Sequence, residues 1–135
     1  MLLSIDSEAI QADLQAIADC TDTPPPGVTR VVYGPADQRA RAYLRARCAE
    51  AGLQLREDGL GNIFARWPGA DPALPAVASG SHIDAIPASG TFDGTVGVVG
   101  ALEALRALRR AGFVPQRSLE LLLFTSEEPT RFGVG

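Results

Sequence analysis

Residues 76–84 read Ala-Val-Ala-Ser-Gly-Ser-His-Ile-Asp, a short run of apolar and small side chains that ends in a histidine and a carboxylate. The first part of this run, residues 76–80, follows Pro75 and is typical of a buried strand. A helical pattern covers residues 94–111, and residues 119–124 form a second apolar run. Strand, helix and strand in this order predict a parallel α/β unit. The apolar side of the predicted helix consists of Val98, Leu102, Leu105 and Leu108.

The preceding part of the chain predicts two helices. Residues 4–19 carry apolar side chains at a helical period, and Ser4 or Asp6 is a possible N-cap. After a proline-rich loop, a second helix is expected to begin at Pro35 and to end at Gly52, because proline favours the first turn and glycine the position after the last.

A hairpin is expected next, with strands at residues 53–56 and 62–67 on either side of a turn at residues 58–61. The second helix carries four arginines with apolar residues between them. We expect these arginines to form a solvated face. These arginines are Arg39, Arg41, Arg45 and Arg47.

The fold class predicted from these patterns is α/β with a mostly parallel sheet. A parallel sheet needs cover on both faces, and only one strong helix follows the first core strand. Residues 1–135 therefore look like the N-terminal portion of a catalytic domain that has been cut partway.

Composition excludes several classes of function. The chain has 135 residues, is 46% hydrophobic and carries a net charge of −4, which fits one soluble globular domain. No basic stripe is present, so nucleic acid is not an expected partner. The apolar runs fall short of the roughly 20 residues that a membrane span requires. Without a basic signal-peptide region the protein is expected to be cytoplasmic, with Cys20 and Cys48 as free thiols.

Polar side chains follow both predicted core strands. His82, the single histidine of the chain, comes at the end of the first strand, and Glu127 and Glu128 come soon after the second. Ligands of open α/β sheets bind outside the carboxyl ends of the strands, so these side chains should lie close together. Imidazole and carboxylate ligands suit zinc, manganese or cobalt.

The spacing also suggests separate roles within such a site. Asp93 is a carboxylate that could bridge two metal ions, which together would lower the pKa of a water molecule. Asp84 could fix the tautomer of the His82 ring. Of the two adjacent glutamates, one could bind metal while the other moves a proton.

Other interpretations of the same residues remain open. A lone histidine, a Glu-Glu pair or an Asp-Gly pair is more often a solvated or turn residue than a ligand. Gly94, Gly97 and Gly100 resemble a phosphate-binding loop, but their spacing is not G-x-G-x-x-G, and close packing of a helix on a sheet is the favoured explanation. A Ser-His-Asp triad would need His82 itself, and no nucleophile elbow is present.

Three motifs carry a resemblance to a known family. Residues 80–87 (Gly-Ser-His-Ile-Asp-Ala-Ile-Pro), 90–94 (Gly-Thr-Phe-Asp-Gly) and 124–132 (Phe-Thr-Ser-Glu-Glu-Pro-Thr-Arg-Phe) resemble the dinuclear metal amidohydrolases of the aminoacylase/carboxypeptidase metallopeptidase superfamily. The branch is that of ureidoglycolate amidohydrolase, allantoate amidohydrolase and N-carbamoyl-L-amino-acid hydrolase. Thr29-Arg30 and residues 61–64 also look like the N-terminal region of that family.

The resemblance implies a three-layer α/β/α metallopeptidase-like catalytic domain with two divalent metal ions, zinc or manganese, with cobalt possible. By this resemblance His82 is a ligand of one ion, Asp93 bridges both, and Glu128 is a ligand of the second. Glu127 is the implied general base, and Asp84 is the acid that orients His82.

The resemblance further implies hydrolysis of a linear amidine, ureido or carbamoyl C–N bond of a small substrate, with release of ammonia. The family places two more histidine ligands and a dimerisation domain downstream, so we expect both to lie beyond residue 135 and the full-length enzyme to be a homodimer. The alternative is a catalytically inactive fragment that lacks these downstream ligands.

Overall fold

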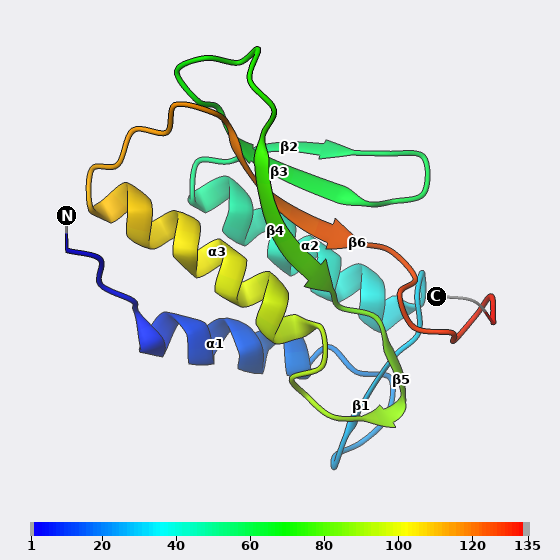
Figure 1. Cartoon of the computed structure of the whole chain (residues 1–135). Coiled ribbons are helices and arrows are strands. Elements are labelled where there is room, and N and C mark those ends of the chain that lie inside the picture. The colour runs from blue at the N-terminus through cyan, green and yellow to red at the C-terminus, as the bar shows by residue number, and fades with distance from the viewer. Residues whose placement is uncertain (1, 134–135) are drawn as a thin grey trace.

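The protein is represented by a computed structural model that describes residues 2–133, with three helices and six strands in that range (Figure 1). In chain order the elements are α1 (Ser7–Ala18), β1 (Val28–Arg30), α2 (Pro35–Glu50), β2 (Gln54–Glu57), β3 (Ile63–Trp67), β4 (Val77–His82), β5 (Ala85–Ser89), α3 (Thr95–Arg110) and β6 (Leu119–Phe124). The expectation that the chain is cut after residue 135 depends partly on Val134 and Gly135, which lie outside the described residues.

The main sheet has four strands in the order β2-β3-β6-β4. Strands β4 and β6 are parallel, with Val77 opposite Leu119 and His82 opposite Phe124, and α3 connects them. The predicted parallel α/β unit is therefore confirmed. The expectation of a mostly parallel sheet is wrong, because β3 pairs antiparallel with both β2 and β6. A short turn joins β2 to β3, and such a connection permits only an antiparallel pair.

All three helices share one hydrophobic core with one face of this sheet (Figure 1). Alternate residues of the central strands, such as Ala65 and Leu123, point into this core, which also contains Val98 and Leu102 of α3. Within residues 2–133 no helix covers the opposite face, where the Arg56 guanidinium lies 3.7 Å from the centre of the Phe64 ring. The described part of the chain thus has two layers rather than three.

The predicted helix boundaries agree with the structure to within a few residues. Asp6 is the N-cap of α1, and its Oδ1 atom accepts the N–H of Ala9 at 2.9 Å. Gly52 and Gly112 follow α2 and α3 with positive φ angles of 72° and 71°, which close the helices as expected.

A second, two-stranded sheet was missed by the sequence patterns. Strands β1 and β5 pair antiparallel, with Val28 opposite Ser89 and Arg30 opposite Ala85. The partners are distant in the chain, β1 has only three residues, and β5 contains Pro87, so neither segment shows the alternation that predicts a strand.

The prediction that the arginines of α2 form a solvated face is wrong for Arg41. This side chain is 2% exposed, and its Nε atom donates to Asp37 Oδ2 at 2.8 Å. Arg47 also points toward the protein, where it and Arg106 of α3 both donate to the buried carboxylate of Asp13. Cys20 and Cys48 are free thiols, as predicted.

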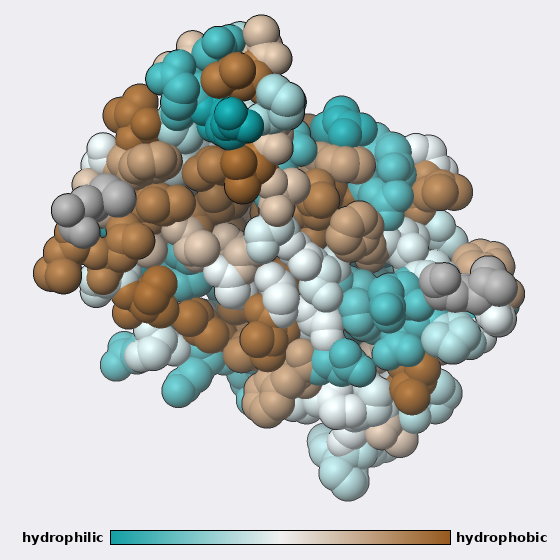
Figure 2. Space-filling view, in the orientation of Figure 1, coloured by the Kyte–Doolittle hydropathy of each residue, from teal (hydrophilic) through white to brown (hydrophobic). Residues whose placement is uncertain are grey.

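The outer edge of β4 borders a groove of about 420 Å³ beside α3, lined mostly by small and apolar residues. Figure 2 shows apolar side chains gathered over this side of the molecule. A helix with the length and apolar character of a membrane span does not occur among residues 2–133.

Candidate metal centre

The residues predicted to form a site converge beyond the carboxyl ends of β4 and β6, as the parallel pairing of these strands requires (Figure 1). His82 is the last residue of β4, Asp93 lies just before α3, and Glu128 follows β6. One ligand atom from each of these three side chains lies within 4.8 Å of the other two. The sequence expectation that His82 and the glutamate pair lie close together is confirmed.

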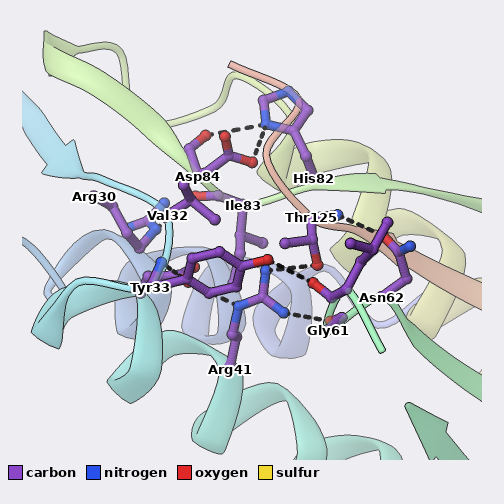
Figure 3. Close-up of polar contacts among 12 residues, drawn as sticks. Arg30, Val32, Tyr33, Arg41, Gly61, Asn62, His82, Ile83, Asp84 and Thr125 are labelled. Carbon is purple, nitrogen blue, oxygen red and sulfur yellow. Dashed lines mark hydrogen bonds and ion pairs between the residues drawn. The ribbon is translucent and has the colours of Figure 1, made fainter. Parts of the chain in front are cut away.

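His82 is held in an orientation that suits a metal ligand. Its side chain is largely buried, and Nδ1 lies 3.0 Å from the backbone oxygen of Asp84 and 3.5 Å from Oδ1 of the same residue (Figure 3). Both neighbours are acceptors, so Nδ1 carries a proton, and in the neutral ring the lone pair is on Nε2. The hydrogen bond with the Asp84 carboxylate, which outweighs burial, raises the pKa of His82. Nε2 faces Asp93 Oδ1 at 3.9 Å and Glu127 Oε2 at 3.4 Å.

Asp84 connects His82 to the glutamate loop. Its carboxylate is 1% exposed and accepts the backbone N–H groups of Glu127 at 3.3 Å and Glu128 at 2.9 Å. Burial alone would raise the pKa of Asp84, but the hydrogen bonds from His82 and from these backbone groups hold it below its ordinary value. An ionised Asp84 therefore fixes both the imidazole ring and the start of the loop that carries the two glutamates.

The remaining carboxylates repel one another in the absence of a cation. Burial, followed by the negative charges of Asp93 and Glu127, raises the pKa of Glu128. Asp93 and Glu127 have side chains that are 67% and 56% exposed, so a solvated ion and a substrate can reach them. One imidazole nitrogen and several carboxylate oxygens form a donor set that fits zinc, manganese or cobalt.

Glycines bring helix α3 against this site. Gly94 has a φ of +66°, and a Cβ at this position would lie 2.5 Å from His82 Nε2. A Cβ on Gly97 would lie 2.7 Å from the Cβ of Ser81. Close packing of helix on strand, the favoured interpretation of the glycines, is confirmed for Gly94 and Gly97. It is not confirmed for Gly100, where a Cβ would meet no atom within 4 Å.

Several polar residues beside the site were not predicted from the sequence. Asn62 Oδ1 accepts the backbone N–H of Thr125 at 2.8 Å, and Arg41 Nη2 donates to Thr125 Oγ1 at 3.1 Å (Figure 3). The spacing of Asp37 and Arg41 by four residues is the one signal in the sequence that could have indicated a paired, inward-facing arginine.

The cluster of His82, Asp93 and Glu128 could hold a metal ion, which is a feature of metal-dependent hydrolases, and comparison with known proteins gives the family. Residues 62–133, which include all five predicted site residues, match the model of Peptidase family M28. The chain belongs to this family, and the resemblance seen in the motifs is confirmed.

Within that class the chain is similar to amidohydrolases that act on non-peptide C–N bonds. It is 56% identical over 132 residues to the ureidoglycolate hydrolase of Arabidopsis thaliana, covering 98% of this chain and 28% of that protein. It is 48% identical over 110 residues to the N-carbamoyl-L-amino-acid amidohydrolase of Paenarthrobacter aurescens, covering 82% of this chain and 27% of that protein.

A solved structure agrees with this placement. The crystal structure of AtUAH in complex with glyoxylate superposes with a TM-score of 0.96 at 56% identity, covering 98% of this chain and 31% of that one. The same protein has been solved with (S)-hydroxyglycine. The chain therefore spans less than a third of the length of these relatives.

Proposed function

We propose that the protein carrying this chain is a metal-dependent amidohydrolase that cleaves a ureido or carbamoyl C–N bond and releases ammonia. The observation that carries the proposal is the convergence of His82, Asp93 and Glu128 within 4.8 Å, with Glu127 beside them. The similarity to ureidoglycolate hydrolase and to N-carbamoyl-L-amino-acid amidohydrolase supports the same reaction class.

The proposed site holds two divalent ions, zinc or manganese, with cobalt possible. His82 would bind one ion through Nε2, Glu128 would bind the other, and Asp93 would bridge them. When bound, such ions supply Lewis acidity, which polarises a carbonyl group and lowers the pKa of water toward 7. Three side chains are too few ligands for two ions, so the complete site requires ligands in addition to those that residues 2–133 supply.

Glu127 is the proposed general base. Its side chain is 56% exposed, and Oε2 lies 3.4 Å from the ring nitrogen that would face the ion. It would accept a proton from the attacking water and deliver it to the departing nitrogen. Asp84 is proposed to keep the His82 tautomer and the glutamate loop in place throughout. Its backbone oxygen lies 3.0 Å and its Oδ1 atom 3.5 Å from His82 Nδ1, and its carboxylate accepts the backbone N–H of Glu128.

The proposed substrate is a small ureido acid, with ureidoglycolate as the first candidate and allantoate or an N-carbamoyl amino acid as the others. The complexes of AtUAH with glyoxylate and (S)-hydroxyglycine, both small ureide-related ligands, support this choice. We further propose that the whole protein is a homodimer with a three-layer catalytic domain, as the resemblance to the family implies.

Ammonia release from ureidoglycolate, allantoate and N-carbamoyl amino acids tests the proposal. The purified protein, loaded with zinc or manganese, should release ammonia from at least one of them, and a chelator should abolish the release. Glu127→Gln should also abolish it, while Glu8→Gln, an exposed change in α1, should not. Ammonia release that persists after complete metal removal would contradict the proposal. Metal binding without release from any substrate would favour the inactive-fragment alternative.

A further inference from the structure

The loop that carries Glu127 and Glu128 is anchored on two sides. On one side the Asp84 carboxylate accepts the N–H groups of both glutamates. On the other side Thr125, two residues before Glu127, is held through its backbone N–H by Asn62 and through Oγ1 by Arg41. Asp84 belongs to the site already described, whereas the anchor at Thr125 lies outside it.

Arg41 occupies the centre of this second anchor (Figure 3). Its guanidinium donates to three segments: Nε to Asp37 Oδ2 at 2.8 Å, Nη1 to the backbone oxygen of Gly61 at 2.7 Å, and Nη2 to Thr125 Oγ1 at 3.1 Å. A guanidinium is a planar fork with fixed donor directions, so its three partners are fixed relative to one another. Helix α2, the turn between β2 and β3, and the end of β6 are thereby held in one arrangement.

The partners of Arg41 are adapted to this arrangement. Gly61 has a φ of +86°, a conformation that presents its carbonyl to the guanidinium and that other residues rarely adopt. Asp37 is 0% exposed and also accepts the backbone N–H of Tyr33 at 2.8 Å. The far end of the glutamate loop returns to the same region, because Arg131 Nε donates to the Val32 carbonyl at 3.0 Å.

We propose that Arg41 is a positioning residue that acts through Thr125 to set where Glu127 and Glu128 stand relative to His82. The inference deepens the proposed function and rests on it for the roles of the two glutamates. Arg41 contacts neither metal ligand nor base directly. It fixes the residue from which the loop departs, and Ser126 (φ +61°) then turns the chain so that the next two side chains face the site.

The decisive variants change Thr125, because loss of Arg41 would leave the buried Asp37 carboxylate unpaired and threaten the fold itself. Thr125→Val keeps the shape of the side chain and removes the Oγ1 acceptor, whereas Thr125→Ser keeps that acceptor. Thr23→Val makes the same change at an exposed threonine in the loop before β1, where Oγ1 donates to Thr29 Oγ1 at 2.9 Å. The protein would be studied with Zn²⁺ alone as the probe, by competition with a chromogenic chelator, and its metal-free melting temperature would be measured in parallel.

Thr125→Val should weaken zinc binding by about 10–100-fold, the effect typical of groups that support metal ligands. Its metal-free melting temperature should stay close to that of the wild type, and Thr125→Ser and Thr23→Val should bind zinc normally. The proposal has Arg41 affect zinc binding through Thr125, so Arg41→Lys combined with Thr125→Val should weaken zinc binding no further than the worse single change. Normal zinc affinity in Thr125→Val, or equal losses in the Val and Ser variants, would overturn the proposal.

Zinc affinity does not depend on hydrolysis, so the two proposals can fail separately. A wild-type protein that releases no ammonia would contradict the proposed function and leave the zinc result for Thr125 intact. If the wild type is active and Thr125→Val has the same activity and the same zinc affinity, only the positioning role is contradicted.

Discussion

His82 and Gly94 are packed so closely that a Cβ on Gly94 would lie 2.5 Å from the Nε2 atom of His82 and 2.6 Å from its Cε1 atom. Real carbon and nitrogen atoms do not approach to that distance without bonding, so the imidazole ring can occupy its position only against a glycine. The N-cap of α3 is thus packed directly against the ring whose Nε2 atom is proposed to bind metal.

Gly94→Ala should therefore displace the His82 ring and weaken zinc binding by about 10–100-fold. It should also destabilise the fold by at least about 1–2 kcal/mol, because a φ of +66° strains alanine and its Cβ would lie 2.6 Å from the backbone oxygen of His82. Gly112→Ala is the matched control, since its φ is +71° but a Cβ there would meet no atom within 4 Å. Equal zinc affinities in the two variants would show that the contact with His82 has no role in metal binding.

Asp84→Asn should weaken zinc binding by about 10–100-fold as well. An amide offers only one acceptor oxygen, so one of the backbone N–H groups of Glu127 and Glu128 loses its partner, and the negative charge beside His82 is lost. Asp71→Asn provides the control, because that carboxylate accepts the backbone N–H of Ala73 in a loop. Chelator competition should detect a loss for Asp84→Asn and none for Asp71→Asn. An unchanged affinity for Asp84→Asn would remove Asp84 from the site.

Asp13 should stabilise the fold in a pH-dependent way. Burial alone would raise the pKa of Asp13, but hydrogen bonds from Tyr43, Arg106 and Arg47 hold it below its ordinary value of 3.8. A lowered pKa means that this stabilisation is fully present above 3.8 and is lost as the pH falls through the folded-state pKa.

At neutral pH, Asp13→Asn should lower the free energy of unfolding by about 2–3 kcal/mol, because it leaves Arg47 and Arg106 without their buried anion. Urea unfolding of the wild type and of Asp13→Asn should show that the difference in their free energies of unfolding decreases as the pH falls below the ordinary pKa of an aspartate. Asp19→Asn, an exposed change just after the same helix, should have little effect. If the difference in the free energy of unfolding were unchanged in acid, the charge of Asp13 would not be the cause of the stabilisation.

The local patterns of the chain predicted most of its elements and the convergence of its site. The run that ends at His82 and the run at residues 119–124 are parallel strands, as predicted. The expectation that the first run is buried is wrong, because β4 lies at the edge of the sheet and its first three residues are exposed. Helix α3 between them shows its apolar side in every turn. Parallel pairing then places the carboxyl ends side by side, and this is why His82 and the glutamate pair could be predicted to meet.

The parts that could not be predicted depend on contacts between distant segments. The antiparallel pairing of β3 with β6 leaves no signal within either strand, so the sheet was expected to be mostly parallel. The burial of Arg41 results from acceptors at Gly61 and Thr125, which are 20 and 84 residues away in the chain. An arginine between apolar residues of a helix looks solvated until those acceptors are known.

The central claim is that the two adjacent glutamates divide their work, with Glu128 as a metal ligand and Glu127 as the base. The most direct test measures zinc affinity and ammonia release side by side for Glu127→Gln and Glu128→Gln. We expect Glu127→Gln to bind zinc almost normally and to release no ammonia, and Glu128→Gln to lose zinc affinity. Ammonia release by Glu127→Gln at the wild-type rate, or wild-type zinc affinity in Glu128→Gln, would contradict the account.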